Sequence, residues 1–313
     1  MTTFVVRRVG LAAVQIFAVG SIVFLLVRLI PGDPARAVLG DDATDDQITA
    51  VRASMHLDDS VASQFFGFWW RLLQGDLGTS LVSGRAVVED LPGRVGNSME
   101  LVFIAIAIAL VVGIPLGRLA ATHANRFFDH ILTGGSVLGI SLPVFVLGTL
   151  LLLLFGIVWP ILPPARFATF AQDPVEHLQL LILPVLALAA SSAAVIVRMT
   201  RSAMLETLGS DYVRTAKAKG LSNHLVIDKH ALRPAMLPVL SVTSIELTTL
   251  IGSTVLIETL FGWPGMSSLL LNAVETRDYP VIQTVVLATA VIVILVNLAT
   301  DLLVRVLDPR TEV

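Results

Sequence analysis

Six long apolar runs leave few folds open to this chain. An α-helix needs roughly 20 consecutive apolar residues to cross the bilayer core, which is about 30 Å thick. Only 14% of the 313 residues are charged, which is too few to give a chain of this size a solvated surface. The sequence therefore predicts an all-α integral membrane protein with six transmembrane helices. The runs occupy residues 9–30, 98–121, 131–159, 178–199, 236–257 and 281–306.

The basic residues predict the orientation of these spans, because short cytoplasmic segments are enriched in Lys and Arg. The first run follows Arg7 and Arg8, and no small-x-small cleavage site follows it, so we interpret it as an uncleaved signal anchor. With the N-terminus inside, both termini are cytoplasmic and the acidic segment 31–95 lies outside. The cytoplasmic segments then carry Arg7, Arg8, Arg118, Arg126, Arg198, Arg201, Arg214, Lys217, Lys219, Lys229, Arg233, Arg305 and Arg310.

The outside segment, residues 31–95, is too long for a simple loop. Thr44 and Gln47 have the spacing of a helix capping box. The run "QFFGFWWRLLQGD" (64–76) is aromatic and amphipathic, as is typical of a helix at the membrane interface. The acidic cluster 41–46 lacks the Gly and the distal Glu of a calcium loop, so we interpret it as a solvated helix cap. A helical extracytoplasmic scoop against the outer membrane face is expected.

Catalytic patterns are absent from the sequence. The chain has no cysteine, no H-E-x-x-H, no G-x-S-x-G and no G-x-x-x-x-G-K-[ST] phosphate loop. It is therefore not expected to be an enzyme, to hold a metal or another cofactor, or to hydrolyse ATP alone. The passage of a solute across the membrane is a better expectation than an intramembrane reaction.

Polar groups within the spans are candidates for lining such a passage, because an ionisable side chain in hydrocarbon usually faces a bundle interior or water. Glu246 lies mid-run and either faces a translocation cavity or hydrogen-bonds to a neighbouring helix. Asn97, Glu100 and Glu258 lie near the outer boundary, where solvation at the interface is the alternative. Pro143 is a further pathway candidate.

Other features of the runs predict helix packing. Pro143 and Pro184 are expected to kink their helices, and Gly139 and Gly148 are expected at close helix contacts. Asn297 and Asp301 are four residues apart and share a helix face. They predict a packing or subunit-interface pair.

The stretch "SDYVRTAKAKGLSNHLVIDKHALRPAMLP" (210–238) is basic and polar between two apolar runs. At 100° per residue, Tyr212, Ala216 and Gly220 fall on one stripe, which would be nearly bare backbone over which another surface can approach closely. Physical reasoning leaves two interpretations open. One is a surface helix at anionic lipid headgroups, and the other is a docking element.

This stretch resembles the cytoplasmic coupling loop of the permease subunits of ABC importers. The family's pattern is Glu-Ala-Ala, three residues, Gly, nine residues and Ile-x-Leu-Pro. The chain matches it at Ala216, Gly220 and Leu232. It departs at Arg214, Thr215, His230 and Arg233, as is typical of the dipeptide/oligopeptide branch. Further resemblance to the first permease of that branch lies in "LIPGDPARAVLG", "GDLGTSLVSGRAV", "GISLPVFVLG", "ETLFGWPGMSSLLLNAVETRDYPVIQ" and "VNLATDLLVRVLDPR".

The resemblance implies a division of labour in a bacterial plasma (inner) membrane. A second homologous permease shares the pathway, two ATPase subunits bind ATP and Mg, and an extracytoplasmic solute-binding protein delivers the solute. The ATPase-coupling helix would comprise Tyr212, Arg214, Thr215, Ala216, Lys217, Gly220 and Leu221. The binding protein would dock near Trp263, Pro264, Gly265, Arg277, Asp278 and Tyr279.

The same resemblance implies the domains and the class of substrate. The expected domains are an N-terminal span (1–30), the scoop (31–95), a type I permease core (96–306, with the coupling loop at 200–235) and a tail (307–313). The expected solutes are di- or oligopeptides; nickel, glutathione or another small solute is the alternative, as is a stand-alone secondary transporter or channel. The branch often carries Gln in place of Glu246, so an acid there favours a solute with a cationic group.

Overall fold

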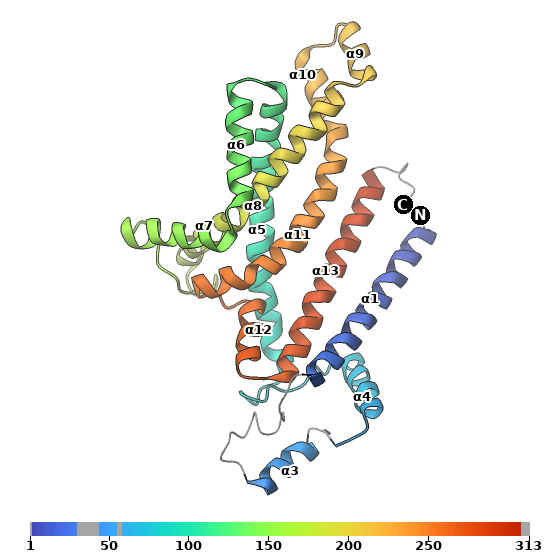
Figure 1. The fold of residues 1–313 in the computed structure, drawn as a ribbon, viewed down its shortest axis with the longest axis vertical. Coiled ribbons are helices and arrows are strands. Elements are labelled where there is room, and N and C mark those ends of the chain that lie inside the picture. The colour runs from blue at the N-terminus through green and yellow to red at the C-terminus, as the bar shows by residue number, and fades with distance from the viewer. Residues whose placement is uncertain (1, 30–43, 55–57, 308–313) are drawn as a thin grey trace. The chain divides into compact units, whose positions relative to one another are not determined.

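The computed structural model describes residues 2–29, 44–54 and 58–307. These residues form helices, apart from connecting turns and an antiparallel bridge between Thr79 and Ala86. Residues 31–43, with Asp41 and Asp42, and the tail 308–313 lie outside the described residues. The helices, including the π-helices η1 and η2, are α1 (Thr2–Leu29), α3 (Asp45–Ser54), α4 (Val61–Leu73), α5 (Val87–Thr122), α6 (Phe127–Ser141), α7 (Val144–Leu151), η1 (Leu152–Val158), α8 (Pro174–Leu208), α9 (Asp211–Ala218), α10 (Asn223–Leu225), η2 (Val226–Leu232), α11 (Arg233–Phe261), α12 (Met266–Glu275) and α13 (Tyr279–Leu307) (Figure 1).

The predicted all-α membrane architecture is confirmed. Among the described residues, five helical segments are long and apolar enough to cross a membrane, and a sixth is present if the bent pair formed by α6 and by α7 with η1 counts as one span. The five segments are Val5–Leu29, Val87–Thr122, Pro174–Leu208, Asn223–Phe261 and Tyr279–Arg305.

The run 131–159 does not form the single helix expected of a span. Its two halves meet at an angle of 99°. The break lies at Leu142, which is extended (φ −83°, ψ 121°), because the ring of a following proline disfavours helical backbone at the preceding residue. Pro143 then caps α7, so the predicted kink at this proline is a sharp break. Helix α8, by contrast, continues through Pro184.

By packing, the chain divides into two compact units. Unit 1 comprises Met1–Ser98 and Pro264–Leu295, and unit 2 comprises Met99–Trp263 and Val296–Val313. The segment from Pro264 to Leu295 therefore packs with residues of the N-terminal part of the chain, within unit 1. Helices α5 and α13 each pass from one unit into the other.

Aromatic packing holds unit 1 together. Phe24 of α1, Phe68 of α4 and Leu287 of α13 are buried against one another. Helix α4 begins at Ser60, whose hydroxyl accepts a hydrogen bond from the Ser63 N–H at 3.2 Å. Its opposite edge leaves Phe66, Trp70 and Leu73 exposed, as the aromatic run 64–76 predicts for an interfacial helix. Helix α3 begins directly after Thr44, where the sequence predicts a cap.

Helix α8 is the centre of unit 2, and two other helices approach it through glycines. A Cβ added at Gly117 of α5 would lie 2.6 Å from the Val197 carbonyl oxygen, and one at Gly139 of α6 would lie 2.9 Å from the Ala194 Cβ. Gly148 of α7 makes a similar approach to Ile257 of α11, at 3.0 Å. Close packing at Gly139 and Gly148 is therefore confirmed, and small residues are needed where membrane helices cross closely.

The predicted packing role of Asn297 is visible in unit 2. Its side-chain oxygen accepts hydrogen bonds from the hydroxyls of Ser244 at 3.2 Å and Thr248 at 3.5 Å, which joins α13 to α11.

Candidate functional site

The basic stretch folds into a compact element, which we call the basic segment (residues 210–232). Helix α9 ends at Ala218, and the chain turns at Gly220, which has φ +78°. A side chain at such a positive φ is strained, so glycine suits this position. Helices α10 and η2 then fold back, and the Tyr212 hydroxyl donates a hydrogen bond to the His230 carbonyl at 3.2 Å.

The bare stripe expected on this segment is not an open surface. Ala216 is 7% exposed and packs with Val213 of the same helix and Val226 of η2, beside Leu208. Gly220 lies beyond the end of α9, in the turn. The expectation of an outward Ala216 face is wrong because η2 folds back over it. The small side chain admits a neighbouring helix of the same chain.

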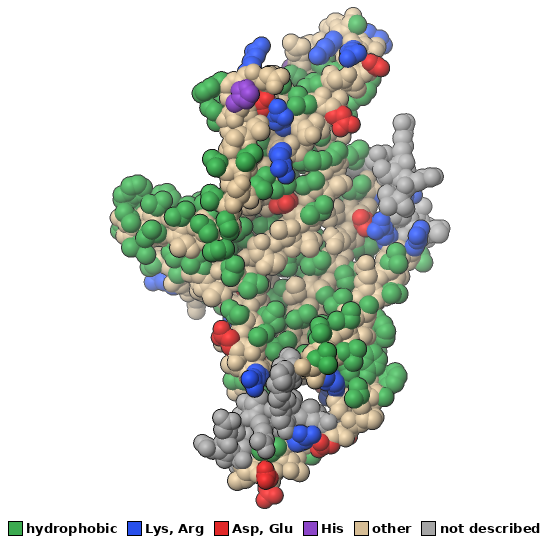
Figure 2. Space-filling model, in the orientation of Figure 1, with side chains coloured by type: hydrophobic (Ala, Val, Ile, Leu, Met, Phe, Trp, Pro, Cys, Tyr) green, Lys and Arg blue, Asp and Glu red, His purple; other side chains and the backbone are tan. Residues whose placement is uncertain are grey.

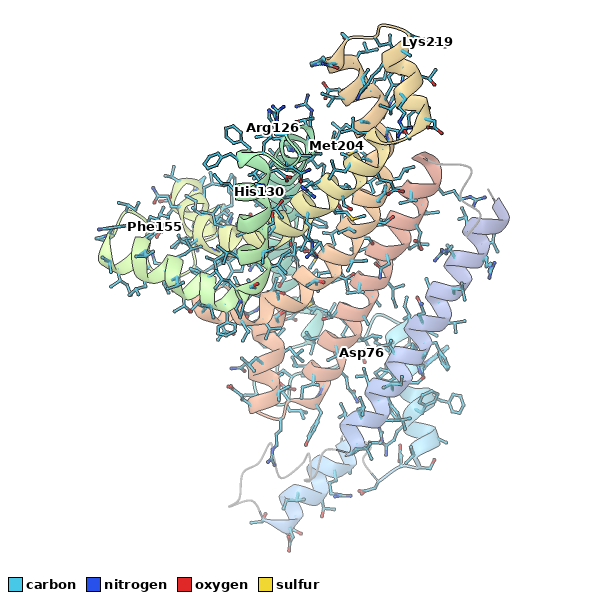
Figure 3. All side chains as sticks on the ribbon, turned by 45° about the horizontal axis from the view of Figure 1, so that its top comes forward. Asp76, Arg126, His130, Phe155, Met204 and Lys219 are labelled. Carbon is cyan, nitrogen blue, oxygen red and sulfur yellow. The ribbon has the colours of Figure 1, made fainter. Side chains whose placement is uncertain are left out.

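The exposed surface of the basic segment is made by other side chains. Arg214, Thr215 and Lys217 project from α9, and Lys219 lies at the tip of the turn (Figure 3). Lys and Arg side chains gather around α9 and α10 in Figure 2. Three large apolar side chains, those of Tyr212, Leu221 and Leu225, are exposed beside them. A basic surface with exposed apolar side chains can bind an anionic partner that also offers apolar contact.

An apolar cluster and an ion pair are among the contacts that hold the basic segment to the rest of unit 2. Ala231 is fully buried in an apolar cluster with Ala121 of α5 and with Ala203 and Met204 of α8. The second contact is an ion pair, in which the Arg118 Nε of α5 donates to the Asp228 carboxylate of η2 at 2.7 Å.

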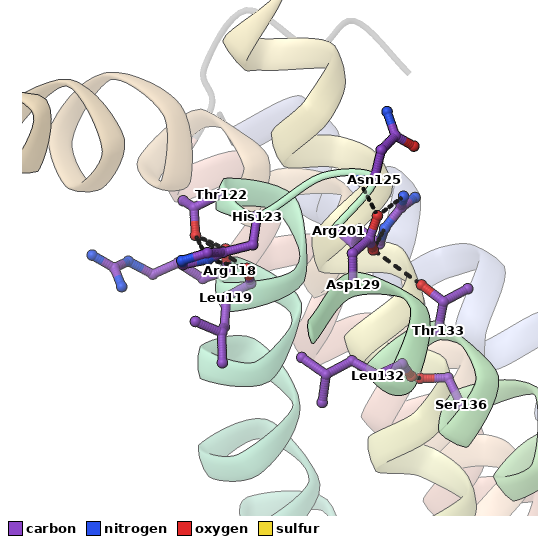
Figure 4. A network of polar contacts seen from close by, with 10 residues as sticks. All are labelled: Arg118, Leu119, Thr122, His123, Asn125, Asp129, Leu132, Thr133, Ser136 and Arg201. Carbon is purple, nitrogen blue, oxygen red and sulfur yellow. Dashed lines mark hydrogen bonds and ion pairs between the residues drawn. The ribbon is translucent and has the colours of Figure 1, made fainter. Parts of the chain in front are cut away.

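A buried ion pair lies close to this junction. Asp129 of α6 is 2% exposed, and its carboxylate accepts hydrogen bonds from Nε and Nη2 of Arg201 on α8, the latter at 2.7 Å (Figure 4). The Asn125 backbone N–H and the Thr133 hydroxyl also donate to it, at 2.8 and 3.2 Å. A buried charge needs this degree of pairing. The pair fastens the start of α6 to α8.

The pathway candidates are held by different partners. In unit 1, the Asn97 amide donates to the Pro264 carbonyl at 2.9 Å. In unit 2, Glu100 lies 2.9 Å from Nε2 of His177, and Glu246 is half-buried on α11 near Ser192 of α8. Glu258 is fully buried. The two predicted roles of Glu246, lining a cavity and hydrogen-bonding to a neighbouring helix, stay predictions.

His177 ties together several elements of unit 2. Its Nδ1 lies 2.8 Å from the Ala168 carbonyl, and Nε2 faces Glu100. The Ala168 carbonyl and an ionised Glu100 carboxylate both accept hydrogen bonds, so an imidazolium ring that donates from both nitrogens fits this geometry. Phe167, Phe170 and Trp263 surround the ring, with centroids 5.4–6.3 Å away.

Most of the residues expected to dock the binding protein are buried within the chain. Trp263 is 1% exposed and packs edge-on against Phe167 at 4.9 Å. Asp278 and Tyr279 are also buried, because the Asp278 carboxylate accepts hydrogen bonds from the Ser80 hydroxyl at 2.5 Å and from the Leu81 N–H at 3.1 Å. Gly265 is buried and Pro264 half-buried. The exposed side chain of the set is Arg277, which has φ +56°.

Sequence reasoning missed the pairs Arg118–Asp228, Asp129–Arg201 and Glu100–His177. Arg118 and Arg201 were assigned only as markers of orientation. An Asp in the first turn after a short polar turn, as at Asp129, is the signal that could have found one of them. Its partner is 72 residues away in sequence. Among the described residues, no group of three or more His, Asp or Glu is placed to hold a metal ion.

Comparisons with known proteins agree along the whole chain. Residues 113–313 match the family "Binding-protein-dependent transport system inner membrane component", and residues 1–86 match its N-terminal family, "Binding-prot-dependent transport system membrane comp, N-term". The dipeptide transport system permease protein DppB of Escherichia coli (strain K12) is 38% identical, over 99% of this chain and 98% of that protein. The glutathione transport system permease protein GsiC of Salmonella typhi is likewise 38% identical, over 99% and 98%.

A solved structure shares the fold. A chain of the inward-facing MetNI methionine ABC transporter (CY5 native crystal form) superposes with a TM-score of 0.54 at 19% identity, over 70% of this chain and 96% of that one. The permeases of this family are non-enzymatic, cofactor-free transport components that work with a separate ATPase subunit and a binding protein. The chain therefore belongs to the binding-protein-dependent transport system inner membrane components, as a multi-pass permease subunit of an ABC importer.

Proposed function

We propose that this chain is the first of two homologous permeases in an importer for short peptides. Two relatives with equal identity over nearly the full chain carry dipeptide and glutathione transport in their names. Glutathione is itself a tripeptide, so the substrate class common to both is a short peptide with free carboxylates. This shared chemistry is the observation that carries the proposal. Nickel or another non-peptide solute, and a transporter that works alone, are the alternative functions.

In this proposal both termini and the basic segment lie in the cytoplasm. The bias of Lys and Arg toward one set of connecting segments supports this orientation. The chain has no cysteine, so an introduced cysteine is its only thiol, and labelling of that thiol shows on which side of the membrane the position lies. Ser222→Cys, on the exposed turn of the basic segment, is expected to react with a membrane-impermeant maleimide only after the cells are opened. Labelling of intact cells would contradict the orientation.

The basic segment docks on an ATPase subunit in this proposal. Tyr212, Leu221 and Leu225 supply exposed apolar contacts, and Arg214 and Lys217 supply positive charge. Because Arg214 stands where the family pattern has Glu, the complementary groove is expected to be acidic. The buried Ala216 acts indirectly, by keeping η2 close to α9. A second permease completes the pathway, and a binding protein approaches the side that carries Arg277.

Glu246 is the proposed determinant of substrate charge. It is half-buried within a span, near the Ser192 hydroxyl. A neutral hydroxyl compensates little of the cost of a carboxylate in a span, so a solute ammonium group would stabilise it. Glu246→Gln is expected to lower uptake of peptides with Lys or Arg side chains more than uptake of neutral ones. Equal effects on both classes would refute this role.

Reconstitution tests the function itself. The permease is placed in proteoliposomes with its second permease, ATPase subunits and binding protein, with ATP inside. A radiolabelled dipeptide is expected to accumulate, and binding-protein-loaded peptide is expected to stimulate ATP hydrolysis. Labelled glutathione and ⁶³Ni²⁺ are measured in parallel. Accumulation of nickel without either peptide would overturn the peptide proposal, and dipeptide uptake without ATPase subunits would favour a transporter that works alone.

A further inference from the structure

The helices of unit 2 are connected to the basic segment in two different ways. Helix α8 ends at Leu208, directly before the segment, and α11 begins at Arg233, directly after it. The backbone therefore passes any displacement of the segment to α8 and α11. Helices α5 and α6 have no such connection, because the chain reaches the segment from them only through α7 and α8. They can follow it only through packing, α5 through its close crossing with α8 and through its contacts with the segment, and α6 through α8.

Helix α6 is attached to α8 by the buried Asp129–Arg201 pair, with two hydrogen bonds between the guanidinium and the carboxylate (Figure 4). Bidentate pairs of this kind fix orientation as well as distance. Movement of α8 therefore carries α6 along through this pair.

Helix α5 contacts the basic segment directly. The apolar part of the contact is a cluster in which the small side chains of Ala121 and Ala231 are both buried. Apolar contacts between alanines are non-directional and allow sliding. The directional part is the 2.7 Å bond from the Arg118 Nε to Asp228 Oδ1. The other Asp228 oxygen lies 3.0 Å from Nε2 of the exposed His224, within the segment itself.

The position of Asp228 suits this bond to transmitting movement between α5 and the basic segment. It lies in η2, a π-helical stretch between the basic segment and α11. π-Helical turns are uncommon and occur frequently at functional sites. About two-thirds of each side chain is shielded from solvent, with 34% of Arg118 and 31% of Asp228 exposed. The bond is therefore less screened than a surface ion pair.

The same helix reaches the other end of unit 2. Glu100, which holds His177, is on α5 and precedes Arg118 by about 27 Å along the helix axis at 1.5 Å per residue. A shift of α5 at Arg118 therefore also moves Glu100. This residue contacts His177, which lies near the start of α8 and is bonded to Ala168 in the preceding connection.

We propose that the Arg118–Asp228 ion pair is the contact through which α5 follows the basic segment, which makes both residues positioning residues for coupling ATP hydrolysis to transport. This inference rests on the function proposed above. The pair touches neither the solute nor ATP. It acts by making α5 move together with the element that meets the ATPase.

The test compares matched charge changes in the complete, reconstituted transporter. Arg118→Gln and Asp228→Asn each break the ion pair, and the double variant Arg118→Asp with Asp228→Arg reverses it. Arg126→Gln is the matched control, because Arg126 is an exposed arginine near the same end of α5 (Figure 3). The readout is the ratio of radiolabelled dipeptide taken up to phosphate released.

Each single change is expected to lower this ratio by roughly 2- to 30-fold, the range typical of residues that carry coupling between sites. The reversed pair is expected to restore most of the ratio, and Arg126→Gln is expected to leave it unchanged. A ratio in Asp228→Asn equal to that in Arg126→Gln would overturn the proposal. So would a loss in both single variants that the reversed pair does not reverse.

A distance measurement tests the same inference without a transported solute. Spin labels are placed at Val111→Cys, an exposed position on α5, and at Ser222→Cys on the basic segment. In the wild-type background the distance is expected to stay constant between nucleotide-free and ATP-bound complexes, and in Asp228→Asn it is expected to change. A distance that changes equally in both backgrounds would overturn the inference. Lack of dipeptide uptake with a constant distance would count against the peptide substrate alone.

Discussion

The crossing of α5 and α8 is sensitive to the addition of a single methyl group. In Gly117→Ala, the new Cβ would lie 2.6 Å from the Val197 carbonyl oxygen and 2.6 Å from the Thr200 Cβ. Non-bonded carbons prefer about 3.5–4.0 Å, so the helices must separate by about 1 Å. Separation also loosens the contact at Gly113, whose own Cβ would be 2.7 Å from the Ile196 Cγ2.

The expected cost follows from these contacts. Overpacking typically costs about 1–3 kcal/mol. The upper end applies here because the Val197 carbonyl oxygen belongs to the backbone and cannot move aside as a flexible side chain can. Alanine recovers about 1 kcal/mol over glycine within a helix, which leaves a net loss of about 2 kcal/mol. In Gly134→Ala on α6 the new Cβ meets no atom within 4 Å, so only the gain of about 1 kcal/mol applies.

The two alanine variants should therefore differ by about 3 kcal/mol in unfolding free energy, in opposite directions from the wild type. The assay is thermal unfolding of the purified importer complex, followed by size-exclusion chromatography of the heated samples. Gly117→Ala is expected to unfold below the wild type, and Gly134→Ala at or above it. If Gly117→Ala proves no less stable than Gly134→Ala, the close crossing of α5 and α8 is wrong.

Three further changes have specific expected results. Gly220→Trp should insert in the membrane but lower dipeptide uptake per ATP, because φ +78° strains any side chain by about 1–2 kcal/mol; Gly220→Asn, which tolerates this backbone, should retain more. His177→Phe should cost about 1–3 kcal/mol in thermal unfolding by leaving the Glu100 carboxylate without its donor, and a stability equal to the wild type would refute that bond. Asp278→Ala should free the turn that it holds and speed trypsin cleavage after the exposed Arg85; an unchanged cleavage rate would show that other contacts hold the turn.

Local composition accounts for much of what could be predicted about the fold. Each apolar run became helical because the hydrocarbon core demands that backbone groups bond internally, and hydropathy follows from the residues of one segment alone. Pro143 could be recognised as a break for the same reason, since the effect of its ring acts on the preceding residue. The 99° angle between the two halves was not predictable, because the packing of α7 against α8 and α11 sets it.

For the site residues too, properties that follow from residue type could be predicted, and burial that depends on the fold could not. Tyr212, Arg214 and Lys217 were correctly expected at the surface of a basic helix, since charge and exposure follow from residue type. Ala216 was expected there too and is buried, because which side of a two-turn helix is covered depends on what folds back over it. The burial of Asp278 could not be predicted for a related reason, because its carboxylate accepts a hydrogen bond from Ser80, which is 198 residues away.

The sequence by itself determined that this chain is a helical membrane protein with a basic insert, and its motifs placed it in a permease family. Those properties depend on hydrophobicity, backbone restrictions and residue order, all of which are local. The tertiary structure alone decided that Arg118 bonds to Asp228 and Asp129 to Arg201, over separations of 110 and 72 residues. Pairing of this kind depends on how closely two helices approach, and small residues such as Gly117 set that approach.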